Sequence, residues 1–246
     1  MNKDEAFRFP REMVIGLLAL AVAWQILSLF VPPFIVPGWQ RIGKSLLTLR
    51  MDFVLVTLAR VVAALVVSFA LGLGVAVLMY ASTPVERYGR PLVRLLMAVP
   101  VVCWILFAVL WFKWVELRIA FVLVVVCAPV FLVDILDAMR GVSKDLRDML
   151  RSFRPTRAQL FTKLVLPATL PAMLTSWKIN LSLAIRVVTI AELVGAVTGI
   201  GYGLVVAQEL FSVAEVFAWT LILVVLLFGA EAVLTRVEGR LLRWRV

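Results

Sequence analysis

Charged and hydroxyl side chains recur along a long apolar segment of residues 172–206. Ionisable side chains are rare in segments that could cross a bilayer, and those present usually face a pathway or another protein group. On a helix of 3.6 residues per turn, the polar residues fall on one stripe roughly 120° wide. The stripe consists of Thr175, Lys178, Ser182, Arg186, Thr189 and Glu192. It predicts a helix that faces a solute pathway or a protein surface rather than lipid.

Each cation in the apolar segments has two interpretations. Lys178 lies near the inner end of its segment, where its long side chain either lines a pathway or snorkels to the membrane surface. Arg186 lies deeper and either lines the pathway or pairs with Glu192 or Asp134. Arg60, in an earlier apolar segment, is expected to pair or to snorkel outward. A pathway lined by Arg186 would suit a small oxyanion.

A basic segment of about residues 140–170 precedes the fifth apolar segment and is predicted to contain two short helices. Ser143 is a candidate N-cap for the first helix, over 144–153, and Pro155 would end it. The second helix begins at Thr156-Arg-Ala-Gln159, which matches a capping box.

The bend between these two helices is predicted to project into the cytoplasm as a docking surface. Pro167 and Pro171 are expected to mark the turn into the following apolar segment. A passive membrane anchor needs no structured basic loop. The other interpretation is a loop whose positive charge only fixes the topology.

The sequence argues against a catalytic, nucleotide or metal site in this chain. Histidine is absent, and Cys103 and Cys127 lie inside apolar runs, so neither a zinc site nor a disulfide is expected. Gly38-Trp-Gln-Arg-Ile-Gly-Lys-Ser45 matches the pattern of a phosphate-binding loop, but it lies between two apolar segments rather than between a strand and a helix. We interpret Trp39 to Met51 as a short amphipathic helix at the membrane surface. The chain is predicted not to be an enzyme and to hold no cofactor.

The composition and the lengths of the apolar runs predict a membrane protein. Hydrophobic residues make up 63% of the 246 residues and charged residues 16%, well above and below the values of soluble domains. About twenty apolar residues span the hydrocarbon core. Six candidate spans run near 14–31, 53–81, 92–112, 119–136, 172–206 and 216–234. Continuous apolarity predicts an all-α, polytopic membrane protein with one transmembrane domain over 1–246, and glycines such as Gly195 and Gly199 predict a break late in the fifth span.

The basic residues predict the orientation. With the N-terminus inside, the inner segments hold seventeen lysines and arginines and the outer segments hold five. This excess predicts a multi-pass protein of the bacterial inner membrane with both termini in the cytoplasm. Because the charges flank apolar runs, the net charge of +10 indicates membrane topology and surrounding lipid rather than nucleic-acid binding.

Several ordered fragments resemble a known family of transport proteins. The fragments are Thr57-Leu-Ala-Arg60, Leu71-Gly-Leu-Gly74, Pro91 through Pro100, Leu166-Pro-Ala-Thr-Leu-Pro171, Ala191-Glu192, Gly199-Ile-Gly-Tyr202 and Arg236 through Trp244. Together they resemble the permeases of binding-protein-dependent ABC importers, of the nitrate/sulfonate/taurine type. The resemblance covers roughly residues 50–246, and it rests on the order and spacing of the fragments.

The resemblance implies the type I importer permease fold, with about six transmembrane helices and two short cytoplasmic coupling helices. It implies a cytosolic ABC ATPase dimer that holds ATP and Mg²⁺, a second permease subunit (a homodimer is favoured) and an extracytoplasmic substrate-binding protein. The solute would be small and anionic or of organosulfur type. The residues expected to contact the ATPase are Asp148, Met149, Leu150, Phe153, Arg154, Pro155, Thr156, Gln159 and Leu160. Those expected along the pathway are Lys178, Ser182, Arg186, Thr189 and Glu192.

The coupling motif departs from the family pattern. The family has Glu-Ala-Ala, a glycine six positions after the Glu, and Leu-Pro about a dozen residues later. Here Asp148-Met149-Leu150 occupies the first three positions and Arg154 the glycine position. Two other functions are kept beside the importer: an ATP-independent channel or carrier, and a membrane scaffold subunit.

Overall fold

The computed structural model describes residues 11–242, and every regular element in that range is a helix, as predicted. The helices are α1 (Arg11–Phe30), α2 (Trp39–Thr48), α3 (Met51–Ala81), α4 (Thr83–Ala98), α5 (Val101–Trp111), α6 (Val115–Arg140), α7 (Lys144–Arg151), α8 (Arg157–Leu160), the π-helical turn η1 (Phe161–Val165), α9 (Leu166–Leu193), α10 (Ile200–Glu209) and α11 (Val213–Leu241).

The described chain separates into two compact units. The small unit contains the described residues up to Arg50 together with Leu204–Leu221. The helix bundle contains Met51–Gly203 and the described residues from Ile222 onward. All residues of the candidate site belong to the helix bundle.

The core of the helix bundle lies where α3 packs along α6 and α6 along α9. Gly72 permits the close approach of α3 to α6, because a Cβ there would lie 2.8 Å from Cβ of Phe131 and 2.9 Å from the carbonyl oxygen of Ala128. Phe131 continues the contact toward α9, and its ring centroid lies 5.5 Å from that of Trp177. Small residues that let two backbones approach closely are typical of contacts between membrane helices.

Three of the described helices are long and apolar enough to cross a membrane, or four if the bent pair α4 and α5 forms one span. The three are α3, α6 and α11, and a shorter apolar stretch covers Leu18–Phe30. The expected count of six crossings is therefore not confirmed. The predicted span 92–112 is broken at Val99, where α4 and α5 meet at 90°. Pro100 explains the break, because proline lacks an N–H group and disfavours helical backbone in the residue before it.

The predicted break late in the fifth span is confirmed. α9 ends at Leu193 and α10 begins at Ile200. Gly199, in the connection, has φ +109°, a conformation open mainly to glycine. A Cβ at Gly201 would lie 2.4 Å from the carbonyl oxygen of Thr189, so the chain folds back closely on the end of α9.

The turn expected at Pro167 and Pro171 is wrong. The helical backbone runs without interruption from α8 through η1 into α9. Pro167 lies in the first turn of α9, and Pro171 lies inside it. The preceding π-helical turn, in which the Leu166 N–H donates to Phe161 O, shifts the hydrogen-bond ladder at the point where Pro167 has no N–H to donate.

The small unit holds α1 against α2. Trp24 Nε1 donates to Pro37 O at 3.1 Å, and Trp39 Nε1 donates to Ala21 O at 3.0 Å. The Trp24 ring also packs against Phe217, with centroids 4.8 Å apart. The residues that matched a phosphate-binding loop thus lie in α2, apart from Gly38 at its N-cap. The helix predicted from Trp39 to Met51 forms, but it ends at Thr48.

Candidate functional site

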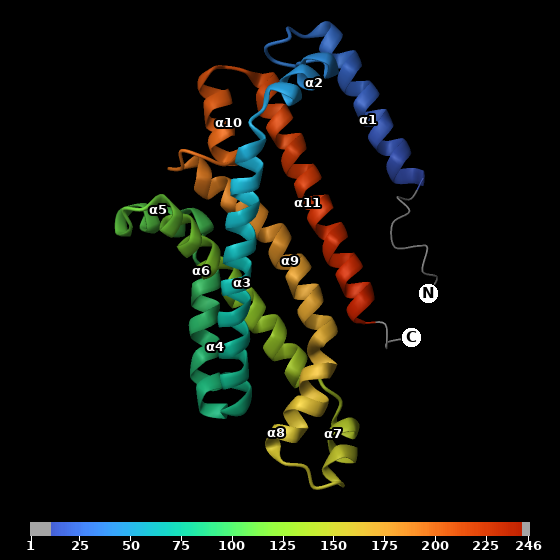
Figure 1. Cartoon of the computed structure of the whole chain (residues 1–246), viewed down its shortest axis with the longest axis vertical. Helices are drawn as coiled ribbons and strands as arrows, with labels where there is room; N and C mark the ends of the chain where they lie inside the picture. Colours follow the sequence, from blue (N-terminus) through green and yellow to red (C-terminus); the bar gives the residue numbers. More distant parts are fainter. Residues whose placement is uncertain (1–10, 243–246) are drawn as a thin grey trace. The chain divides into compact units, whose positions relative to one another are not determined.

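The helices α7 and α8 lie beside each other at one end of α6 and α9 (Figure 1). α7 begins at Lys144 as predicted, although the Ser143 side chain makes no capping hydrogen bond. The capping box of α8 is confirmed: Gln159 N donates to Thr156 Oγ1 at 3.2 Å, and Thr156 N donates to Gln159 Oε1 at 2.9 Å. We call residues 143–160 the docking segment.

An apolar stripe of α7 and the following turn is exposed. Leu146, Met149 and Phe153 are 44%, 58% and 77% exposed. Leu146 and Met149, three residues apart, lie on one face of α7, and Phe153 lies in the turn that follows. A surface of this kind on an exposed segment is typical of a protein contact site.

The residues predicted to contact the ATPase all lie on the accessible part of the docking segment. Leu150, Pro155 and Leu160 are half-buried, and the other six are exposed. Arg154 has φ +50°, in the left-handed region. For a residue with a Cβ this conformation is unfavourable by roughly 1–2 kcal/mol. Arg154 stands at the glycine position of the family pattern. Its backbone thus has a conformation that favours glycine, although the residue is an arginine.

A group of ion pairs that the sequence analysis missed lies at the same end of the bundle. Glu86 accepts from Arg90 Nε at 2.9 Å and from Arg140 Nη2, and Arg90 Nη2 donates to Asp137 at 2.9 Å. The guanidinium of Arg140 lies 4.8 Å from the centroid of the Tyr80 ring. These contacts join α3, α4 and α6 next to the docking segment. Only Glu86 and Arg90, four residues apart, could have been paired from sequence spacing.

The docking segment is tied to the bundle by its own side chains. Arg147 Nη2 donates to Met139 O at 2.7 Å, which holds α7 to the end of α6. Tyr80, at the end of α3, has its ring centroid 6.1 Å from that of Phe161 in η1. The segment is therefore accessible on its outer face and anchored on its inner face.

The residues of the polar stripe predicted on α9 differ in burial and in pairing. Lys178 pairs with Glu238 of α11, and Thr189 and Glu192 are buried. Ser182 is half-buried, and Arg186 is exposed.

The guanidinium of Arg186 has no hydrogen bond or ion pair within residues 11–242. The two partners considered for it are engaged elsewhere, since Asp134 accepts from Ser176 Oγ at 2.6 Å and Glu192 pairs with Arg60. The assignment of all five residues to a pathway stays a prediction.

Arg60 is the centre of a buried polar cluster at the other end of the bundle. Its Nη1 donates to Glu192 Oε1 at 2.7 Å and to Thr198 O at 2.8 Å. Its Nε donates to Glu116 Oε2 at 2.8 Å, and its Nη2 donates to Glu116 Oε1 and to Thr198 Oγ1. All five N–H groups of a guanidinium are thereby engaged. The expectation that Arg60 pairs is confirmed, and no donor of Arg60 is left for a solute in this conformation.

Glu192 joins this cluster to the break after α9. Thr57 Oγ1 lies 2.9 and 3.0 Å from its two carboxylate oxygens, and Gly201 N donates to Oε2 at 2.9 Å. Thr57 Oγ1 also accepts from Ile200 N at 2.9 Å. A Cβ at Gly199 would lie 2.4 Å from Cδ of Glu192, so the carboxyl group fills the place of a side chain there.

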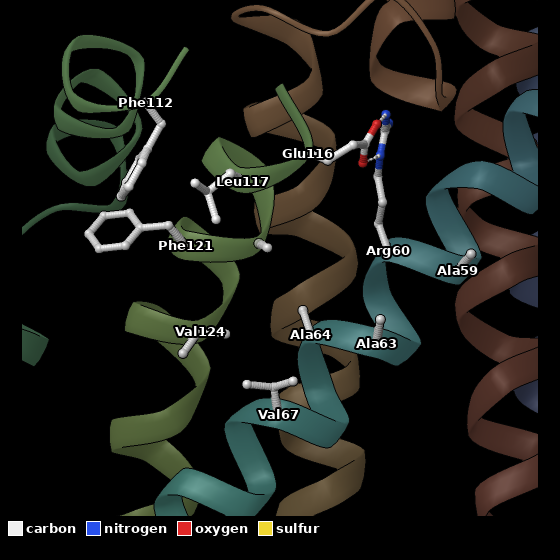
Figure 2. Close-up of a pocket in the computed structure, with 11 residues that line it drawn as sticks. Ala59, Arg60, Ala63, Ala64, Val67, Phe112, Glu116, Leu117, Phe121 and Val124 are labelled. Carbon is white, nitrogen blue, oxygen red and sulfur yellow. Dashed lines mark hydrogen bonds and ion pairs between the residues drawn. The ribbon is translucent and has the colours of Figure 1, made fainter. Parts of the chain in front are cut away.

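A cavity of about 580 Å³ lies between α3 and α6, next to the polar cluster (Figure 2). Arg60 and Glu116 lie at one end of it, and its walls are apolar. The walls are formed by Ala59, Ala63, Ala64, Val67, Phe112, Leu117, Ala120, Phe121 and Val124. Because the Glu116 side chain is 69% exposed while Arg60 is almost covered, the accessible charge of this cavity is a carboxylate.

Long apolar helices that carry an anchored, exposed and basic segment at one end define a polytopic membrane protein. Residues 68–243 match the family described as binding-protein-dependent transport system inner membrane component. The chain belongs to this family of transport permeases.

Two curated relatives match nearly the whole chain. The formylaminopyrimidine transport permease protein ThiX of Halalkalibacterium halodurans is 28% identical over 95% of this chain and 96% of its own length. The taurine transport system permease protein TauC of Escherichia coli K12 is 28% identical over 94% of this chain and 88% of its own length. Both names describe permeases of small-molecule transport systems, in agreement with the nitrate/sulfonate/taurine type predicted from the sequence fragments.

Solved structures share the fold. A chain of the inward-facing MetNI methionine ABC transporter superposes with a TM-score of 0.70 at 19% identity, covering 77% of this chain and 94% of that one. A chain of an amino acid ABC transporter gives a TM-score of 0.61 at 16% identity, covering 80% and 93%. The importer permease fold expected from the sequence is confirmed.

Proposed function

We propose that this chain forms half of the translocation pathway of an ATP-driven importer, through which a small anionic or organosulfur solute enters the cytoplasm. A second copy would form the other half, an extracytoplasmic binding protein would deliver the solute, and both termini would lie in the cytoplasm. ATP and Mg²⁺ would be held by a separate ATPase dimer. The observation that carries the proposal is the docking segment, in which Leu146, Met149 and Phe153 expose an apolar stripe among basic residues.

The continuity of α8, η1 and α9 supports a mechanical role for the docking segment. Residues 157–193 form one uninterrupted helical rod, roughly 55 Å long at 1.5 Å per residue. Its first turn belongs to the docking segment, and its far end carries Arg186 and Glu192. When the ATPase subunits close on ATP, a shift of the docking segment would move this rod as a rigid body and change which side of the membrane the pathway faces.

The solute class rests on Arg186 together with the names of the relatives. Arg186 is an exposed guanidinium on a helix whose neighbouring exposed residues, Ile179 and Ile190, are apolar. A guanidinium flanked by apolar side chains would attract an anionic group of the solute. Taurine carries a sulfonate, and the relative TauC is named for its transport.

Substitution of Arg186 by Gln is expected to raise the KM of ATP-driven uptake about tenfold, since a hydrogen bond to a charged group contributes about 1.5–3 kcal/mol. Arg186→Lys should retain most of the uptake. Uptake of radiolabelled taurine by proteoliposomes that contain permease, ATPase and binding protein measures both. Exposed Arg41 on α2 offers the matched control Arg41→Gln, and an equal effect at the two positions would contradict a pathway role for Arg186.

The importer itself is tested by reconstitution. Full-length permease should co-purify with an ATPase, and uptake should require ATP and the binding protein. Uptake by the permease alone would instead favour an ATP-independent carrier. An assembled complex that moves no solute would favour a scaffold subunit.

A further inference from the structure

The bend between α7 and α8 holds an arginine where the backbone favours glycine. The φ of Arg154 is +50°, which brings a Cβ close to the following carbonyl oxygen. Arg154 also precedes Pro155, and a residue before proline prefers an extended backbone with φ near about −120°. Glycine would adopt a positive φ without the Cβ penalty. The large side chain is thus kept at a position where its presence strains the backbone.

No hydrogen bond or ion pair of the Arg154 side chain within residues 11–242 offsets this strain. Its backbone N–H donates to Arg151 O at 2.9 Å, but its guanidinium has no hydrogen bond or ion pair in that range. Arg151 pairs with Asp148 at 3.2 Å, and Arg147 donates to Met139 O at 2.7 Å. The guanidinium of Arg157, like that of Arg154, has no hydrogen bond or ion pair in that range, but the φ of Arg157 is not positive.

The charges around Arg154 indicate what its guanidinium would meet. Arg151 and Arg157 flank it, and both are exposed. The docking segment contains two acids: Asp148 pairs with Arg151, and Asp145 forms no ion pair with Arg154. The structure therefore leaves Arg154 open to an acid of another molecule. Strained residues cluster at binding and switching sites, where a contact made by the side chain explains why the strain is retained.

We propose that Arg154 forms an ion pair with an acidic side chain on the ATPase surface that receives the docking segment. The inference rests on the proposed function. It adds that the ATPase surface carries an acidic side chain where it meets Arg154. Phe153, 77% exposed beside it, would enter the apolar part of the same surface. Arginine is among the residues that contribute most to binding at the centre of protein interfaces.

Three variants test the proposal, because they separate the effect of the Arg154 charge from the effect of its backbone strain. Arg154→Gln keeps the strain and removes the charge, Arg154→Gly removes both, and Arg154→Lys keeps both. The measurement is the affinity of the ATPase for full-length permease in nanodiscs of phosphatidylcholine, at 50 and 500 mM NaCl. Arg41→Gln, at an exposed arginine of α2, is the matched control.

At 50 mM NaCl the Gln and Gly variants are expected to bind the ATPase about tenfold more weakly than the unmodified chain, and the Lys variant within threefold. The difference should shrink at 500 mM NaCl, because salt screens an accessible ion pair. The Gly variant should unfold at the same temperature as the Gln variant or higher, since it lacks the strain. A merely tolerated arginine would give no loss of ATPase binding.

Gln and Gly variants that bind the ATPase within twofold of the unmodified chain at 50 mM NaCl would overturn the proposal. So would a loss that appears only when the nanodiscs contain anionic phosphatidylglycerol, which would assign Arg154 to a lipid headgroup. If the unmodified chain itself bound no ATPase, the proposed function would fail. This result is distinct from normal binding by the Gln and Gly variants and from a loss that requires anionic lipid.

Discussion

Replacement of Glu192 by Ala should destabilise the helix bundle more than any other single substitution of a charged residue considered for this protein. The change removes a fully buried carboxylate that holds Arg60, Thr57 and Gly201 N together. Breaking a buried ion pair by removing one partner typically destabilises by about 3–5 kcal/mol. For a domain of this size the melting temperature should fall by roughly 10 °C, measured by thermal unfolding in detergent.

Glu116 offers the matched control, because it pairs with the same guanidinium but its side chain is 69% exposed. Pairs open to solvent contribute only about 0.2–1 kcal/mol. Glu116→Ala should therefore lower the melting temperature by a third of the Glu192→Ala effect or less. Equal losses in the two variants would show that burial does not set the strength of the cluster.

Removal of the apolar stripe of the docking segment should abolish ATP-driven uptake while leaving the permease folded. In the triple variant Leu146→Ser, Met149→Ser and Phe153→Ser, little packing within the chain is lost, because these side chains are exposed. Each would contribute about 1.5–3 kcal/mol if it became fully buried against the ATPase. Uptake and stimulated ATP hydrolysis should fall at least about a hundredfold, and the melting temperature should change by less than about 3 °C.

A comparable exposed leucine away from the docking segment provides the control. Leu47, on α2, is 88% exposed, and Leu47→Ser should leave ATP-driven uptake within twofold of the unmodified chain. Normal uptake by the triple variant would contradict the assignment of residues 143–160 to ATPase attachment.

The docking segment could be predicted from sequence because its determinants are local. Thr156 and Gln159 cap a helix through bonds between residues three apart. The preceding helix begins at Lys144 as predicted, but it ends at Arg151, before the predicted end at 153 and well before Pro155. Gly199 marks the break after α9 by a local signal as well, since its φ is positive. Such signals need only a few adjacent residues.

The polar cluster could not be assembled in this way. Arg60 meets Glu192 across 132 residues and Glu116 across 56, and no spacing rule relates positions on different helices. The helical period predicted one polar stripe on α9 that contains Lys178, Arg186 and Glu192, but these residues lie in different surroundings. The period could not indicate that the packing of α3 and α11 against part of that stripe would leave Arg186 exposed.

The turn expected at Pro171 failed because proline was interpreted by its local preference alone. An interior proline destabilises a helix by about 3 kcal/mol, yet α9 stays continuous through Pro171. Thr169 and Met173, two residues to either side, are buried in the bundle, so tertiary packing holds this part of the helix. Val99-Pro100 does break its helix. The same residue type thus has opposite outcomes, and the tertiary contacts of each segment decide between them.

The direct test of attachment at the docking segment is a photo-crosslink from position 153. Phe153 is aromatic and exposed, so p-benzoylphenylalanine can replace it without disturbing the fold. In membranes that contain the assembled importer, illumination should join this position to the ATPase. The same group at exposed Trp114, at the opposite end of α6 from α7, should not reach it. Crosslinking to the ATPase from Trp114 and not from Phe153 would contradict the account.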